Sequence, residues 1–241
     1  RDAILEAGEG HGLVPVGSRA YATNTLESGW IPSPLPAIYT GESMRGYREW
    51  LSDKSYEATG AIGGSYESDN IEDYYLSPWD LGYDFYVKFD HDFIGREALE
   101  KMADKQHRRK VTFEWNPEDC INAFATLFED GANVKAMDFP LFNYASSSYD
   151  KIMSGDKMVG LSMFAGYSYN ERRALSLGTV DADVKEGDEL KLVWGEPEPG
   201  TEKTTVEPSR QMEIRVRVSK VPYSSDARES YVDSWRTRKN A

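Results

Sequence analysis

The amino-acid sequence predicts an α+β protein that ends in a small β-barrel or sandwich. Beyond residue 110, short segments of strand composition are separated by Gly, Asp or Pro, a spacing typical of such domains. These segments are 158–169, 174–184, 188–195 and 212–223. Before residue 110, helical patterns alternate with extended and proline-rich stretches. The chain has 241 residues, enough to bury a sizeable core in one large domain or two modest ones.

The N-terminal stretch predicts a short helix followed by extended structure. Residues 2–9 read as the helix, with Gly10 and Gly12 ending it. The stretch "GSRAYATNTLESGW" (17–30) then alternates like a strand. A strand of period two would place several polar side chains on one face. They are Arg19, Tyr21, Thr23, Thr25 and Glu27. On periodicity alone, this face lies in water at a sheet edge or lines a pocket for a polar heterocycle.

Residues 31–75 predict an inserted segment that covers another part of the protein. The segment is rich in Pro, Gly, Ser and Tyr, and it is too long and too aromatic for a plain linker. Within it, "ESMRGYREWL" (42–51) predicts a short helix. The run "GAIGG" (60–64) indicates a turn rather than a phosphate-binding loop, because no Lys-Ser/Thr follows it.

The next stretch predicts a strand, a helix and a boundary. Apolar and polar residues alternate over 83–89, which indicates a strand with one face inward. Gly95 precedes a helix over 96–105, and the basic run 107–110 is expected to be a linker. We therefore divide the chain into 1–107, with the insertion at 31–75, and 108–241.

The second part begins with a strand, "KVTFEW" (110–115), and a helix. Asn116 is the expected N-cap of that helix and Pro117 its first residue. Cys120 lies in this helix and is expected to be a core residue rather than a nucleophile. The polar tail 224–241 is expected to be peripheral.

Composition narrows the class of protein. The formal net charge of −13 argues against nucleic-acid and anionic-membrane partners, because the field of the protein would repel phosphates. No apolar run approaches the roughly 20 residues of a membrane helix. A single cysteine allows no intrachain disulfide and fits a reducing, cytoplasmic setting. The three histidines show no ligand spacing, so no metal site is expected.

Three segments carry a family resemblance that covers about residues 14–223. "GSRAYATNTLESGW" resembles the G-x-R-A…LE-x-G-aromatic segment of the folate-binding T-protein (glycine cleavage aminomethyltransferase) superfamily. "LSPWDLGYDFYVKFDHDFIGREAL" (76–99) resembles its "TP…E-x-G…W-x-V-K…DFIG-x-E-AL" segment more specifically. "VGLSMFAGYSYNERRALSLGTVD" (159–181) resembles its C-terminal barrel. The resemblance implies the C-terminal part of a T-protein-like fold, an antiparallel sheet with helices, followed by a small barrel.

Within the superfamily, the chain most resembles tetrahydrofolate-dependent O-demethylases of vanillate, 3-O-methylgallate or syringate. Tyr21, Trp30, "IPSPLP" and the aromatic insertion carry this likeness. Such enzymes move a methyl group from an aryl ether to N5 of tetrahydrofolate. Two features depart from the T-protein. Tyr21 and Ala22 replace its Arg-Asp pair, and the insertion has no counterpart there.

The resemblance implies roles for four residues. Glu27 would bind the pterin through its 2-amino and N3 hydrogens, and Trp30 would pack against folate or the aromatic substrate. Tyr21 would be catalytic and donate to the ether oxygen, because its pKa near 10 matches a phenolic leaving group. Arg19 would bind a carboxylate of substrate or folate. Each residue also has a plainer interpretation as a solvated, packed or ion-paired side chain.

Three functions stay open at this stage. The first is an aromatic O-demethylase. The second is another one-carbon transferase, such as an aminomethyltransferase or a demethylase of dimethylsulfoniopropionate or glycine betaine. The third is a folate-binding fragment or subunit without activity of its own. Family members are roughly twice as long as this chain, so an N-terminal half or partner chain is expected to complete the site.

Overall fold

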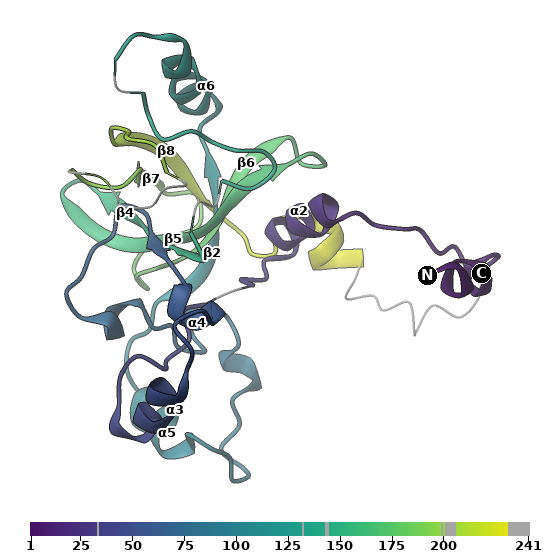
Figure 1. Cartoon of the computed structure of the whole chain (residues 1–241), viewed down its shortest axis with the longest axis vertical. Coiled ribbons are helices and arrows are strands. Elements are labelled where there is room, and N and C mark those ends of the chain that lie inside the picture. The colour runs from purple at the N-terminus through teal and green to yellow at the C-terminus, as the bar shows by residue number, and fades with distance from the viewer. Residues whose placement is uncertain (33, 132, 143–144, 199, 201–205, 231–241) are drawn as a thin grey trace.

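A closed six-stranded antiparallel barrel forms the body of the protein in a computed structural model (Figure 1). The structure describes residues 1–32, 34–131, 133–142, 145–198, 200 and 206–230. The strands follow the order β2-β6-β5-β4-β7-β8 around the barrel. Their bounds are β2 Arg109–Trp115, β4 Asp150–Ser154, β5 Lys157–Ser168, β6 Arg173–Val180, β7 Glu189–Trp194 and β8 Met212–Ser219. The α+β class and the predicted barrel are therefore confirmed.

The barrel core is built by alternation along each strand. In β8, Ile214, Val216 and Val218 are buried while the residues between them are exposed. Trp115 and Trp194 meet edge to face in the interior, with ring centroids 5.4 Å apart. The indole N–H of Trp115 donates to Ser176 Oγ at 2.9 Å, so the interior also satisfies its polar groups.

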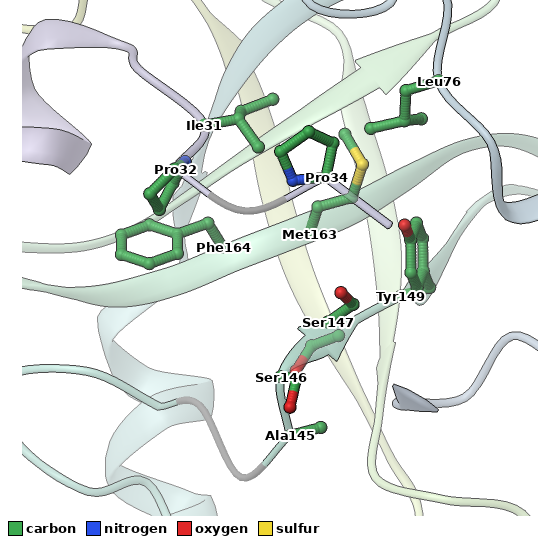
Figure 2. A pocket seen from close by; sticks show the side chains of 11 residues that line it. Ile31, Pro32, Pro34, Leu76, Ala145, Ser146, Ser147, Tyr149, Met163 and Phe164 are labelled. Carbon is green, nitrogen blue, oxygen red and sulfur yellow. The ribbon is translucent and has the colours of Figure 1, made fainter. Parts of the chain in front are cut away.

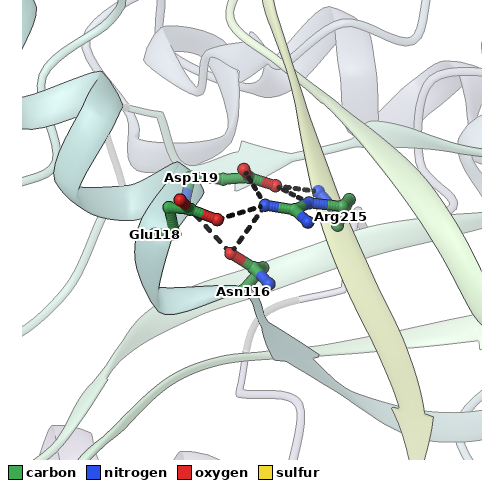
Figure 3. Close-up of polar contacts among 4 residues, drawn as sticks. All are labelled: Asn116, Glu118, Asp119 and Arg215. Carbon is green, nitrogen blue, oxygen red and sulfur yellow. Dashed lines mark hydrogen bonds and ion pairs between the residues drawn. The ribbon is translucent and has the colours of Figure 1, made fainter.

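Helix α6 (Pro117–Ala125) follows β2 and is tied to β8 by a cluster of polar contacts (Figure 3). Arg215 makes an ion pair of 2.8 Å with Asp119 and one of 3.0 Å with Glu118. The Arg215 guanidinium holds the pKa of the Asp119 carboxyl below its usual range. The Asn116 side chain accepts from the Asp119 backbone N–H, as the predicted N-cap requires. Cys120 packs against the barrel core, which confirms its predicted place.

The chain before the barrel consists of short elements. They are α1 Asp2–Gly8, α2 Ser18–Ser28, η1 Glu42–Met44, α3 Arg45–Trp50, α4 Tyr56–Thr59, β1 Ile62–Gly63, η2 Ile71–Tyr74, η3 Asp84–Tyr86 and α5 Arg96–Ala103. The predicted helices at 2–9, 42–51 and 96–105 are thereby confirmed, with α5 ending earlier than expected. Figure 1 shows α1 on an extended arm away from the barrel, and α2 beside the C-terminal η5 (Asp226–Ser230). The described part of the tail thus lies beside α2, whereas 231–241 lie outside the described residues.

Part of the segment 31–75 packs against the barrel. Its strand β1 pairs in parallel with β3 (Ser147–Ser148), which lies just before β4. Ser65 then donates from its backbone N–H to Asp150 and from its hydroxyl to the Val193 carbonyl, at 3.0 and 2.7 Å. These bonds fix the insertion to two barrel strands.

Three expectations for this region are wrong. Residues 18–28 form helix α2 rather than a strand. The alternating stretch 83–89 contains the 3-10 turn η3 and no strand, because the turn at Gly82 (φ 67°) and the bond from Tyr83 N–H to the Pro78 carbonyl bend the chain. The basic run is not a linker, since Arg109 and Lys110 already belong to β2. The division at 107/108 stays a prediction. No helix among the described residues is long and apolar enough to cross a membrane.

Candidate functional site

Helix α2 ends at a glycine that fixes the course of the chain. Gly29 adopts the left-handed conformation (φ 75°), and both its N–H and that of Trp30 donate to the Thr25 carbonyl. A Cβ at Gly29 would lie 2.4 Å from Val221 Cγ2, so the close approach also requires glycine. The helix end therefore sets the position of Trp30 relative to the last turns of α2.

Tyr21 and Trp30 come together at the surface of this helix. Their rings meet edge to face, with centroids 6.3 Å apart and an interplanar angle of 78°. Tyr21 is 59% exposed and Trp30 41% exposed, so both keep ring surface open to a ligand or to another protein surface. Tyr and Trp are enriched at interfaces, because each combines a large apolar ring with a polar group.

Glu27 lies on a different side of α2, against the barrel. Its side chain is 7% exposed. One carboxylate oxygen accepts from Ser168 Oγ, and Asn170 Nδ2 donates to both oxygens at 3.2 and 3.1 Å. The backbone carbonyl of Glu27 accepts from the Ser224 N–H at 3.1 Å. Glu27 thus joins α2 to the end of β5, to the turn after it and to the C-terminal segment.

The helix separates residues that a strand would have aligned. Successive residues on a helix turn by about 100°, so residues two apart point to nearly opposite sides. Arg19 is therefore on the other side of α2 from Tyr21, and it is exposed. The structure brings together Tyr21 and Trp30, buries Glu27 and leaves Arg19 apart. The shared face of Arg19, Tyr21 and Glu27 expected for a strand does not exist.

A cavity begins directly after Trp30 (Figure 2). Its volume is about 80 Å³, large enough for water molecules or a small group. Apolar side chains of the "IPSPLP" segment and of β5 form one part of the lining, and the serines before β4 form another. Figure 2 shows Pro34, Met163 and Tyr149 gathered around it. The serines were not singled out in the sequence, because hydroxyls without a partner motif give no signal.

A buried ionic cluster lies beside Gly64 of the insertion. Lys135 Nζ is 2.7 Å from a carboxylate oxygen of Glu196, and the Gly64 N–H donates to the same oxygen at 3.2 Å. Burial opposes ionisation of Glu196, but its hydrogen bond and attraction to Lys135 outweigh that effect and lower its pKa. Burial raises the pKa of nearby Asp150 to about 7, although the charge of Lys135 opposes the rise. The cluster binds the insertion at Gly64. Its residues are distant from Tyr21 in the sequence and belong to other elements than α2.

The described residues contain no group of three or more His, Cys, Asp or Glu side chains that could hold a metal ion. Burial raises the pKa of the Cys120 thiol to about 12, and the charge of Asp119 adds to the rise. A thiol of that pKa is protonated at neutral pH and is a poor nucleophile. Around α2, the functional groups available for chemistry are the phenol of Tyr21, the carboxylate of Glu27, the indole of Trp30 and the ammonium of Lys110.

Known proteins match the chain over nearly its whole length, although no family model matches it. It is 49% identical over 238 residues to a protein named syringate O-demethylase from Sphingobium sp. (strain NBRC 103272 / SYK-6), covering 98% of this chain and 52% of that protein. It is 30% identical over 247 residues to a sesamin methylene transferase from Sinomonas sp. (strain No.22), covering 96% of this chain and 52% of that protein.

A third match covers less of both chains. An aminomethyltransferase from Thermotoga neapolitana is 26% identical over 118 residues, which is 49% of this chain and 26% of that protein. The chain spans about half the length of the first two relatives. It is therefore similar to proteins named as a demethylase, a methylene transferase and an aminomethyltransferase, and these matches agree with the resemblance of its motifs to the T-protein superfamily.

Proposed function

We propose that this chain forms part of a tetrahydrofolate-dependent O-demethylase. The enzyme would move a methyl group from a methoxylated aromatic acid, such as vanillate, 3-O-methylgallate or syringate, to N5 of tetrahydrofolate. The observation that carries the proposal is the exposed Tyr21–Trp30 pair at the capped end of α2, on a chain 49% identical to a syringate O-demethylase. The single cysteine supports a cytoplasmic location.

Tyr21 would act on the leaving group. A methyl aryl ether releases a phenolate when the methyl–oxygen bond breaks, and a phenol that donates to that oxygen lowers the barrier. The exposed side chain of Tyr21 leaves its hydroxyl accessible to such an oxygen. Trp30, held edge-on to Tyr21, would offer its open ring surface to an aromatic ring of substrate or folate.

Glu27 would hold the pterin of tetrahydrofolate, which supplies the nitrogen that accepts the methyl group. A carboxylate has about four lone-pair sites, and the three bonds from Ser168 and Asn170 leave one of them on Glu27, so a pair of N–H donors would displace one of the two bonds from Asn170. The two neighbours would keep the carboxylate in a fixed orientation for a pair of N–H donors. Arg19, on the opposite side of α2 from Tyr21, would bind a carboxylate at the edge of the site.

The site is proposed to be completed by an N-terminal half or a partner chain. The chain spans about half the length of its relatives, and Tyr21, Trp30 and Arg19 are exposed in it. Residues on the completing part would cover the open side of the Tyr21–Trp30 pair and supply the remainder of the substrate pocket.

The assay uses the complete enzyme, with tetrahydrofolate and vanillate, syringate or dimethylglycine. 5-Methyltetrahydrofolate from an aromatic acid supports the proposal. Transfer of a methyl group from dimethylglycine to tetrahydrofolate, which needs no oxidant, would instead support the second candidate, another one-carbon transferase, which the match to the Thermotoga aminomethyltransferase favours. Folate binding without either product would indicate a binding subunit.

Two variants then test the residue roles. Tyr21→Phe should lower kcat by about 10²- to 10⁴-fold while tetrahydrofolate still binds. Tyr56→Phe, on exposed α4, is the matched control and should leave turnover unchanged. Near-normal turnover of Tyr21→Phe would remove that phenol from the mechanism.

Glu27→Ala should raise the dissociation constant for tetrahydrofolate in a titration. Because this change also frees Ser168 and Asn170, Ser168→Ala serves as the control that disturbs the same bonds and keeps the carboxylate. Equal affinities of the two variants would contradict the pterin role of Glu27.

A further inference from the structure

The side chain of Lys110 connects the end of α2 to the loop before η3. It leaves the start of β2, and its Nζ donates to the Gly29 carbonyl at 2.8 Å. The same Nζ lies 5.3 Å from the ring centroid of Tyr83. A Cβ at Gly82 would lie 2.8 Å from Lys110 Cε, so the glycine makes room for the lysine stem. Lys110 therefore lies between the two segments that carry the family motifs.

The ammonium group of Lys110 differs from that of a lysine in an ordinary structural ion pair. Across the described part of the chain no carboxylate pairs with Lys110, although the protein has a net charge of −13. Burial lowers the pKa of Lys110. The neighbouring Arg108 shows the ordinary arrangement, with Asp80 at 2.8 Å. Lys110 instead meets the negative end of α2 and the face of a ring, which favour a cation.

The bond from Lys110 acts on the peptide plane that precedes Trp30. The Gly29 carbonyl and the Trp30 N–H belong to one planar unit. The N–H donates to the Thr25 carbonyl at 3.2 Å, and the carbonyl accepts from Lys110. The plane is thus held on both sides, by the helix and by the barrel. Because the Trp30 side chain leaves the backbone directly after this plane, its orientation depends on both bonds.

We propose that Lys110 is a positioning residue that holds Trp30 beside Tyr21. This role rests on the proposed function of the α2 surface, and Lys110 itself does not contact substrate. The barrel would thereby limit the movement of an aromatic side chain that is 41% exposed. Loss of the ammonium would leave the carbonyl unpaired and allow the plane to rotate.

The first measurement is amide hydrogen exchange at Trp30 in the complete enzyme. Lys110→Met keeps the length of the stem and removes the donor, so exchange at Trp30 should accelerate about 10-fold or more. Lys101→Met, on the exposed surface of α5, is the matched control and should change nothing there. Lys110→Arg, which keeps a cationic donor, should restore part of the protection.

The second measurement is a double-mutant cycle on kcat with Lys110→Met and Trp30→Ala. Lys110→Met should lower kcat about 10- to 100-fold, because small misplacements of positioning groups have effects of this size. In the Trp30→Ala background it should cause no further loss. A merely structural role would give additive losses.

The outcomes separate this role from the proposed function. An enzyme without methyl transfer would overturn the proposed function, and exchange at Trp30 would still decide whether Lys110 holds the peptide plane. Unchanged exchange, or additive losses in the cycle, would overturn the role of Lys110. Should Lys110→Met fail to fold, Lys110→Gln, a shorter and neutral side chain, passes through the same two measurements.

Discussion

The barrel and the chain before it differ in how they bury apolar surface. The barrel encloses its own core, in which Trp115 is 1% exposed. Among the described residues before the barrel, the buried Leu26, Ile31 and Tyr74 instead form a cluster with barrel residues such as Leu161 and Leu177. Several large apolar side chains in this earlier region are exposed. They include Ile4, Val14, Val16, Trp50, Tyr86 and Ile94.

This difference shows which region can be stable by itself. A closed barrel leaves no sheet edge and fills its interior with its own side chains. The earlier region depends on the barrel for its buried residues and has further apolar surface that nothing in the described residues covers. That surface supports the proposed completing half, because exposed apolar patches mark interaction sites.

The largest expected effect is a loss of barrel core. Trp115→Ala should lower the free energy of unfolding by about 3–5 kcal/mol, because it leaves a cavity and an unpaired Ser176 hydroxyl. Trp50→Ala, at a side chain 78% exposed, should change it by less than about 0.5 kcal/mol. Denaturant unfolding measures both. Equal losses would show that stability does not reside in the barrel.

A smaller effect is expected where the insertion meets the barrel. Gly64 has φ 99°, and a Cβ there would lie 2.2 Å from the Tyr149 carbonyl oxygen. Gly131→Ala provides the control, since Gly131 has φ 107° and open space around it. The control should lower the free energy of unfolding by about 1–2 kcal/mol because of the backbone conformation alone. Gly64→Ala should lower it by about 1–3 kcal/mol more than the control does, because its Cβ also overlaps the Tyr149 carbonyl.

Limited proteolysis locates the damage from Gly64→Ala. Cleavage should increase within 31–75 while the barrel strands stay protected. The same loss of stability in both glycine variants would mean that the insertion is not held by this close approach.

The smallest effect concerns pH and the buried Asp150. Burial raises its pKa from 3.8 to about 7, so between these values the folded state binds more protons than the unfolded state. Stability from this group is therefore present at low pH and is lost as pH rises toward 7. Asp150→Asn should remove at least about 1 kcal/mol of that pH dependence, the equivalent of one pKa unit.

Unfolding curves at pH 4.5 and pH 7.5 measure this change. Asp156→Asn, at an exposed turn between β4 and β5, is the control and should keep the wild-type dependence. A wild-type slope in Asp150→Asn would assign the pH dependence to other groups.

The barrel could be predicted because the sequence pattern that indicates each strand lies within that strand. In β8, charged residues alternate with Ile214, Val216 and Val218, and the period of two follows directly from a sheet with one buried face. The cap of α6 was equally local, since Asn116 and Pro117 adjoin the helix that they start.

Helix α2 could not be predicted in the same way, because contacts with residues distant in the sequence stabilise it. The sequence of α2 shows no repeating pattern of apolar residues at helical spacing. Leu26 is its one fully buried large apolar side chain. Ser168 and Asn170, which bind Glu27, lie 141 and 143 residues further along the chain. The motif therefore pointed to the residues of the candidate site, and only the tertiary contacts show which of them lie together.

The pairing of β1 with β3 has a consequence for the order of folding. Ile62 pairs with Ser147, so this small parallel sheet closes a loop of more than 80 residues. Contacts of such separation form slowly, whereas the hairpin of β4 and β5 joins neighbours along the chain. Synthesis from the N-terminus also delivers the insertion before the strands that receive it. The insertion and α2 must therefore wait for the barrel, and during that interval their aromatic side chains are open to chaperones or to the completing half.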